Sequence, residues 1–318
     1  MLNLLKFVVN LEMKKNNRVF DFLYKNLLSE KTKKRGEKFF VSLAIVSFIL
    51  HLIVIELVNL KLIFLNDYSK LLSNPISAIY TPFSFILIYE VYLLVYYLPK
   101  STTIYIGKQY EIISLIIIRR IFKDLTKLQF NNNWFGIKAN LYFTVDLLAT
   151  IVLFYLIYIF YKLNRINEIN QSKIQTSIEV NQFIKFKNWF AIILIPVFLY
   201  LSFSGLITWI YDNFFSLSAI VKNLKDVNKI FFEDFFTILI LVEVLLLLFS
   251  FFLTDKFSKV IRNSGFIIST ILIKLSFGTE GILSTLLIVF AVLFGVIILW
   301  IHNKYEQVEA DKTTVFKT

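Results

Sequence analysis

Long apolar runs alternate with short charged segments along this chain of 318 residues. A helix needs roughly 20 mostly apolar residues to cross the hydrocarbon of a bilayer. Six runs of this kind predict membrane-spanning helices, at 39–58, 79–98, 141–161, 189–210, 230–253 and 282–301. The pattern therefore predicts an all-α polytopic membrane protein.

Two weaker apolar runs, 104–122 and 265–277, carry charged residues. YEIISLIIIRRIF in the first run and GFIISTILIKLSF in the second have the same length, and Arg119 aligns with Lys274. The spans on either side recur in the same order, with the offset of roughly 150 residues that an internal repeat produces. We therefore expect a tandem duplication of a four-segment unit, giving about eight membrane segments, six strong and two weak. Because each unit has an even number of spans, the two four-helix repeats are parallel.

The duplication divides the chain into five parts. These are a basic amphipathic N-terminal arm (1–38), a first four-helix repeat (39–164), a polar linker (165–188), a second four-helix repeat (189–304) and a polar C-terminal tail (305–318). One loop disagrees with eight spans, because the basic residues of 119–138 would lie outside, against the preference of Lys and Arg for the cytoplasmic side. The alternative keeps 104–122 on the cytoplasmic surface or makes it re-entrant.

Composition agrees with a membrane location. Hydrophobic residues make up 57% of the chain and the mean hydropathy is +0.70, above the usual range of soluble domains. The net charge of +12 lies mainly beside the apolar runs. Topology or anionic lipid explains positive charge there, whereas nucleic-acid binding needs a basic surface on a soluble module. We expect a multi-pass protein of the cell membrane, with a cytoplasmic N-terminus and no nucleic-acid partner.

The arm at 1–38 is rich in Lys and Arg, and its apolar residues from Val19 to Leu28 fall at helical spacing. This pattern favours an interfacial helix that binds anionic lipids of the cytoplasmic leaflet. A plain basic arm that fixes the orientation of the chain explains the same residues equally well. Besides the lipid bilayer, the pattern is compatible with a homo-oligomer.

The usual signatures of catalysis are missing from the sequence. There is no cysteine, and the two histidines, His51 and His302, lie in different spans, so we expect neither a thiol catalyst nor a His-based metal site. No GxxxxGK[ST] phosphate loop and no Rossmann fingerprint occurs. The sequence therefore predicts a protein that has no cofactor and is not an enzyme.

Acidic residues inside the apolar runs are the best candidates for function. Glu90 and Glu243 occupy equivalent places in the second span of each unit. A charged side chain in the bilayer core costs about 2.5–3.5 kcal/mol on insertion scales, so such residues face the bundle interior and find a partner. The repeat pairs Glu90 with Arg119 and Glu243 with Lys274.

Three interpretations of these residues are open. Closed ion pairs would fix the register of the helices. Alternatively, the carboxylates line a proton or cation path between the repeats. Arg119 and Lys274 lie near span ends, where their side chains can also snorkel to the interface. Asp146, near the start of the fourth span, either extends a polar track or marks the interface.

The polar residues of each unit follow a characteristic order. An acidic residue lies in the second span, an arginine closes the third, another acidic residue follows, and the fourth span is aromatic-ended. In the first unit these are Glu90, Arg119, Asp124 and VLFYLIYIFYKLN, and the second unit has Glu243 and Lys274 in matching places.

This order resembles the PsiE family of small four-span bacterial membrane proteins, named for induction by phosphate starvation. The resemblance implies the architecture of each unit and says little about activity. The duplication, and lysine in place of arginine in the second unit, depart from the family pattern.

Two functions follow from these observations. The first is a channel or transporter for a small ion, a proton or a cation, that uses the intramembrane carboxylates. The second is a non-conducting membrane protein, such as a sensor, a stress-response component or a scaffold subunit, in which the Glu–Arg/Lys pairs are structural. A continuous wet path between the repeats favours the first, and a dry core with both pairs closed favours the second.

Overall fold

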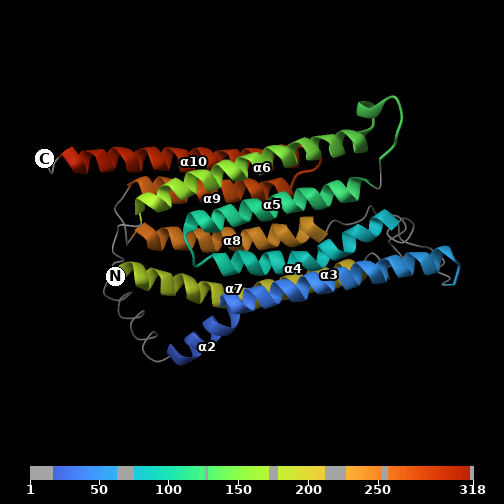
Figure 1. The fold of residues 1–318 in the computed structure, drawn as a ribbon, viewed down its shortest axis with the longest axis horizontal. Helices are drawn as coiled ribbons and strands as arrows, with labels where there is room; N and C mark the ends of the chain where they lie inside the picture. Colours follow the sequence, from blue (N-terminus) through green and yellow to red (C-terminus); the bar gives the residue numbers. More distant parts are fainter. Residues whose placement is uncertain are drawn as a thin grey trace.

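The computed structural model describes residues 17–62, 75–125, 128–171, 178–211, 227–251 and 257–315. Over these ranges the chain is almost entirely helical, and its long helices lie side by side along the long axis of the molecule (Figure 1). The helices are α2 (Asn17–Leu27), α3 (Glu30–Asn59), α4 (Tyr80–Tyr97), α5 (Thr102–Leu125), α6 (Lys138–Gln171), α7 (Ile178–Ile210), α8 (Val227–Phe251), α9 (Phe257–Phe277) and α10 (Ile282–Val315).

Six of the described helices are long and apolar enough to cross a membrane, which makes the chain a multi-pass membrane protein. The qualifying segments are Glu30–Asn59, Lys138–Arg165, Ile184–Gly205, Asp234–Phe251, Phe257–Phe277 and Ile282–Val308. This set differs from the six strong spans predicted. The weak run at 265–277 belongs to α9, whose 21 residues reach spanning length because the helix begins at Phe257. The predicted span 79–98 forms a shorter apolar helix, Thr81–Tyr97.

The segment 104–122, whose topology the sequence left open, lies in α5, a continuous helix of 24 residues. At a rise of about 1.5 Å per residue, α5 is about 36 Å long, enough to cross a bilayer core. It packs between α4 and α6 and also contacts α9 and α10, and between residues 103 and 122 Leu115 alone is exposed. Neighbouring helices therefore shield the charged residues of α5. α5 is not among the helices apolar enough to span a membrane by themselves, so its crossing of the bilayer stays a prediction.

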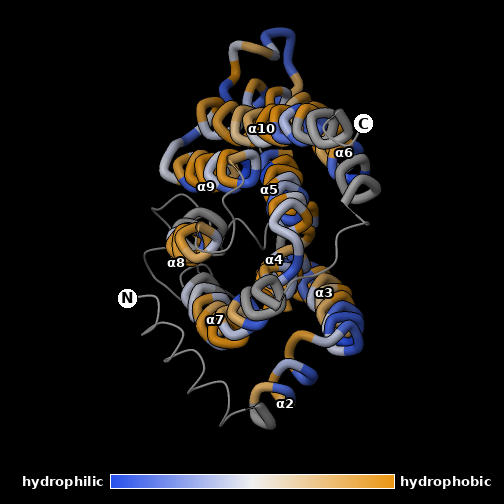
Figure 2. Tube along the Cα trace, turned by 90° about the vertical axis from the view of Figure 1, so that its left-hand side faces the viewer, coloured by the Kyte–Doolittle hydropathy of each residue, from blue (hydrophilic) through white to orange (hydrophobic). Residues whose placement is uncertain are grey.

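Seen end-on, α3–α6 form a first row and α7–α10 form a second row beside it (Figure 2). Within each row, consecutive helices pack on each other and run in opposite directions (Figure 1). The rows are joined by contacts of α4 with α7 and of α6 with α10. The organisation into two parallel four-helix repeats, and their origin by duplication, stay predictions.

The two ends of the bundle are distinct. At one end of the bundle, which we call the hairpin end, α4 and α8 end and α3, α5, α7 and α9 begin (Figure 1, left). α5 and α9 end and α6 and α10 begin at the opposite end. The two ends differ in the side chains that lie near them, as described below.

Several helices extend beyond the predicted segments. α6 continues to Gln171 and α7 starts at Ile178, so most of the linker predicted at 165–188 is helical. α10 continues to Val315, so the predicted tail is helical over 305–315. Neither stretch contains the helix breakers Gly and Pro, which explains why these helices continue past their apolar parts.

The N-terminal arm consists of α2 and the first turns of α3, and residues 1–16 lie outside the described ranges. Ser29 caps α3, since its hydroxyl accepts a hydrogen bond from the Thr32 N–H at 3.2 Å. The apolar side of α2 packs on α7, where the ring centres of Phe20 and Trp189 lie 5.2 Å apart. The amphipathic pattern thus docks α2 on the bundle, and its contact with lipid stays a prediction.

Close packing between the rows depends on Gly295 of α10, because a Cβ atom there would overlap the hydroxyl of Tyr110 on α5. Tyr110 is fully buried, and its hydroxyl lies 2.8 Å from the Ser269 hydroxyl of α9. Ser269 in turn donates a hydrogen bond to the Ala291 carbonyl of α10 at 2.7 Å. Small and hydroxylated residues let membrane helices approach closely, and here they join three helices.

We expect Gly295→Ala to lower the melting temperature of the purified protein in detergent, because overpacking such a contact costs about 1–3 kcal/mol. Gly278→Ala is the matched control, since its Cβ would meet the Leu275 carbonyl oxygen at an ordinary 3.5 Å. Equal melting temperatures for the two variants would contradict the tight packing of Gly295 on Tyr110.

Candidate functional site

Glu90 of α4 and Arg119 of α5 form a buried ion pair. One terminal nitrogen of Arg119 donates a hydrogen bond to the Glu90 carboxylate, and the other donates to the Phe83 carbonyl of α4 at 3.4 Å. Glu90 therefore has the partner that the repeat predicts. The pair joins α4 to α5 and neutralises both charges.

Glu243 of α8 has a different partner from the one predicted. Its Oε1 accepts a hydrogen bond of 2.5 Å from Nε2 of Gln109 on α5. Lys274 does not lie within salt-bridge distance of Glu243, so the predicted Glu243–Lys274 pair is wrong. The reason is the register of α9, because Thr270 donates to Gln109 Oε1 at 3.0 Å and so lies level with Glu243. Lys274 lies one helical turn further along, half-buried in the last turn of α9.

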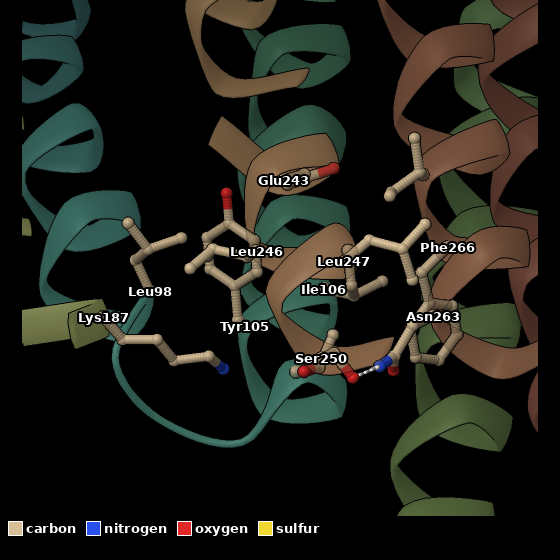
Figure 3. A pocket seen from close by; sticks show the side chains of 12 residues that line it. Leu98, Tyr105, Ile106, Lys187, Glu243, Leu246, Leu247, Ser250, Asn263 and Phe266 are labelled. Atoms are coloured by element: carbon tan, nitrogen blue, oxygen red, sulfur yellow. Dashed lines mark hydrogen bonds between the residues drawn. The ribbon is translucent and has the colours of Figure 1, made fainter. Parts of the chain in front are cut away.

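A cavity of about 40 Å3 lies beside Glu243, between α5, α8 and α9 (Figure 3). Oε2 of Glu243 and the hydroxyl of Tyr105 are both buried without a hydrogen-bond partner, and both residues line this cavity. Buried polar atoms normally bind a partner, and a cavity of roughly 10–15 Å3 already holds a water molecule. The cavity therefore has room for a few water molecules or for one small cation beside the carboxylate.

Polar side chains continue from Glu243 towards the hairpin end of the bundle. Ser250, Asn263 and Lys187 line the same cavity, near the end of α8 and the start of α9 (Figure 3). The Asn263 amide donates to the Ser250 hydroxyl at 3.5 Å, and the Lys187 ammonium donates to the Lys100 carbonyl at 3.2 Å. Glu243 thus lines a mostly apolar cavity whose polar side chains lie towards one end of the bundle.

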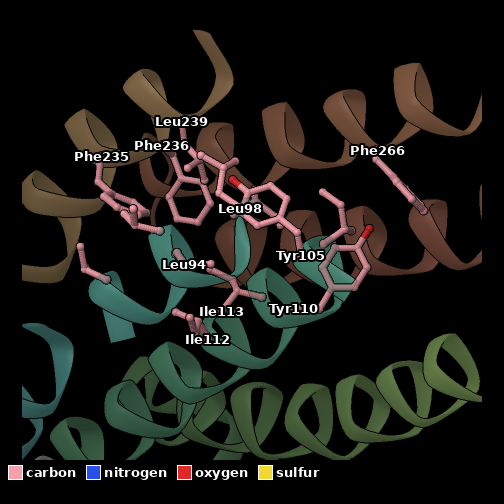
Figure 4. Close-up of a cluster of buried hydrophobic side chains, with 14 of the residues drawn as sticks. Leu94, Leu98, Tyr105, Tyr110, Ile112, Ile113, Phe235, Phe236, Leu239 and Phe266 are labelled. Atoms are coloured by element: carbon pink, nitrogen blue, oxygen red, sulfur yellow. The ribbon is translucent and has the colours of Figure 1, made fainter. Parts of the chain in front are cut away.

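Apolar side chains fill the space between the rows on the other side of Glu243. Phe235, Phe236 and Leu239 of α8 are fully buried in the main apolar cluster (Figure 4). On α5, Gln109 and Arg120 are separated by eleven residues (120 − 109), about 16 Å along the helix. Buried isoleucines occupy this interval, namely Ile112, Ile113, Ile116 and Ile117. A largely apolar barrier therefore lies between Glu243 and the opposite end.

Asp146 of α6 belongs to a second polar cluster, beyond this barrier. Arg120 donates to the two Asp146 carboxylate oxygens at 2.5 and 2.9 Å. The Thr285 hydroxyl of α10 accepts from Arg120 and donates to Asp146, both at 2.6 Å. Asp146 therefore joins three helices and does not line the cavity of Glu243. The sequence interpretation missed Arg120, although a second arginine directly after Arg119 was a signal of a second partner.

The sequence interpretation also missed Gln109 and Tyr105. Both lie before residue 110, where the aligned part of the weak repeat begins, so the repeat gave them no counterpart. Their contribution becomes visible when α5 is placed against α8, because Gln109 hydrogen-bonds Glu243 and Tyr105 shares its cavity.

Within the described part of the chain, no group of three or more His, Cys, Asp or Glu side chains is placed to hold a metal ion. No family model, curated protein or solved structure matches the chain. The resemblance to the PsiE family therefore stays a prediction that rests on its quoted residues.

We expect Glu90→Gln to destabilise the protein, because removing one member of a buried ion pair costs about 3–5 kcal/mol. Thermal unfolding in detergent measures the effect. The double variant Glu90→Gln/Arg119→Gln should recover part of the loss, since it also removes the buried positive charge. Glu56→Gln, at an exposed carboxylate of α3, is the control and should leave the melting temperature unchanged. A single Glu90→Gln variant as stable as this control would contradict a structural role for the pair.

Proposed function

We propose that this membrane protein conducts or transports a proton or a small cation, with Glu243 as the binding group. One observation carries the proposal. A carboxylate oxygen of Glu243 is buried without a hydrogen-bond partner, beside a cavity that extends to one end of the bundle. A carboxylate held among neutral groups in a low-dielectric interior gains stability from a proton or a cation, because either one neutralises it.

Glu90 and Asp146 are poorer candidates for the same role. Arg119 neutralises Glu90, and Arg120 neutralises Asp146. Glu243 is hydrogen-bonded instead to the neutral amide of Gln109. Of the three intramembrane acids, Glu243 is therefore the one best placed to exchange a cation or a proton with solvent.

The arrangement supports access from one side at a time. Polar side chains lead to Glu243 from the hairpin end, and Phe235, Phe236 and Leu239 fill the way to the opposite end. Many transporters bind their ions between two repeats and move one repeat against the other to open the second side. We propose that the two helix rows act in this way, with the apolar barrier as the closed gate.

We further propose that the hairpin end is cytoplasmic in a cell membrane, which places the N-terminus inside. Lysine and arginine concentrate on the cytoplasmic side of membrane proteins. The basic residues that support this orientation lie at or near the hairpin end and are Lys33, Lys100, Lys108, Lys187 and Arg262.

A non-conducting scaffold or sensor is the second candidate function. The closed pairs Glu90–Arg119 and Arg120–Asp146 favour it, because they fix α5 against three neighbouring helices. In that case the Glu243 cavity holds structural water and exchanges no ion with the opposite side.

A flux measurement tests the transport proposal. The protein is reconstituted in liposomes that contain a pH-sensitive dye, and proton, sodium and potassium gradients are imposed in turn. We expect flux from the wild type, and for Glu243→Gln we expect flux at the level of protein-free liposomes, because glutamine cannot bind and release a proton or neutralise a cation. Glu56→Gln is the control and should transport like the wild type.

Two results would contradict the proposal. The first is transport by a folded Glu243→Gln variant at the wild-type rate for every ion. The second is the absence of any flux from well-folded wild-type protein, which would favour the scaffold. Size-exclusion profiles and melting temperatures of each variant separate loss of transport from loss of folding.

A further inference from the structure

A second and larger cavity lies at the hairpin end and is separate from the site of Glu243. Its volume is about 420 Å3, within the range of roughly 300–1,000 Å3 typical of small-molecule sites. Residues of four helices and their ends line it: Tyr24 of α2, Ser29 and Glu30 at the start of α3, Tyr96 and Lys100 at the end of α4, and Ile184 and Asn188 of α7.

Asn188 gives the clearest sign of a ligand. Its side chain is only 8% exposed, and its Oδ1 atom is buried without a hydrogen-bond partner. An amide oxygen accepts hydrogen bonds, so the group that would satisfy it is an N–H or O–H donor. A buried acceptor on the wall of a cavity costs free energy until a donor binds it.

Two charged groups of opposite sign complete the polar wall. The Lys100 ammonium is exposed, lies 4.6 Å from the centre of the Tyr96 ring, and donates to the Tyr96 hydroxyl at 3.3 Å. The Glu30 carboxylate accepts a hydrogen bond of 2.5 Å from the same hydroxyl. Tyr96 therefore holds Lys100 and Glu30 on one wall, and the cavity offers a cation for an anionic group and two acceptors, Glu30 and Asn188, for donors.

The position of the cavity indicates that its ligand comes from the membrane. Tyr92, Tyr96 and Tyr97 lie at this end beside Lys33 and Lys100, and tyrosine and lysine together mark the headgroup level of a bilayer. Apolar residues form the rest of the lining, namely Leu28, Pro99 and Ile184. A ligand with a polar head and an apolar tail matches this division.

From this geometry we propose that the cavity binds the headgroup of a phospholipid that carries a hydrogen-bond donor, such as phosphatidylglycerol or phosphatidylethanolamine. Lys100 binds the phosphate, and the hydroxyl or ammonium hydrogens of the headgroup donate to Asn188 and Glu30. A phosphatidylcholine headgroup has the phosphate but no donor, so it leaves Asn188 unsatisfied. The proposal does not depend on ion transport.

The test is a thermal-shift measurement on the full chain in detergent, with added lipids that share the same acyl chains. We expect phosphatidylglycerol or phosphatidylethanolamine to raise the melting temperature and phosphatidylcholine to raise it less. Asn188→Leu should abolish this preference, because it removes the acceptor and keeps a similar volume. Lys100→Gln should weaken the effect of all three lipids, and Lys304→Gln, at an exposed lysine of α10, should behave like the wild type.

The proposal is overturned if phosphatidylcholine stabilises the wild type as much as the donor-bearing lipids do. It is also overturned if the folded Asn188→Leu and Lys100→Gln variants respond like the wild type. Soluble glycerol phosphate tests the source of the ligand, and stabilisation by it equal to that by the lipids would rule out a membrane lipid as the specific ligand.

Discussion

Arg119 and Arg120 are neighbours on α5, yet they bind partners on different helices. Successive residues of an α-helix point about 100° apart. Arg119 therefore reaches Glu90 on α4, whereas Arg120 reaches Asp146 on α6 and Thr285 on α10. Lipid supplies no hydrogen-bonding partner, so each charge inside the bundle has to be matched by another helix. This requirement holds the most polar helix of the bundle at its centre and fixes the helices around it.

Glu243 shows what happens when the same requirement is met by a neutral group. It occupies the place in the second row that Glu90 occupies in the first, but its partner is the Gln109 amide from the other row. The amide satisfies one carboxylate oxygen and leaves the other buried without a hydrogen-bond partner, in a residue that lines a small cavity. Two acids at equivalent places in the chain thus have different bonding, because the helices packed against them supply different partners.

The two ends of the bundle differ in chemistry. The hairpin end holds the cavity of Glu243, the larger cavity beside α2 and many of the lysine and tyrosine side chains. Towards the opposite end, packed phenylalanine and isoleucine separate Glu243 from the Arg120–Asp146 cluster. Lys187 connects the two cavities, since it lines the first and donates to the carbonyl of Lys100, which lines the second. The linings of the two cavities are therefore joined by one hydrogen bond.

The sequence by itself determined the helical membrane architecture and the acids that lie inside it, because apolar length and the cost of a charge in lipid are local properties of a chain. It also predicted the Glu90–Arg119 contact, which joins two consecutive helices. Only the tertiary structure decided the partner of Glu243, the place of α5, and the two cavities. Each of these depends on contacts between residues more than 60 positions apart, such as Gln109 with Glu243 and Tyr96 with Glu30. Such contacts are set by how the rows pack and by the register of α9, which hydrophobic length does not specify.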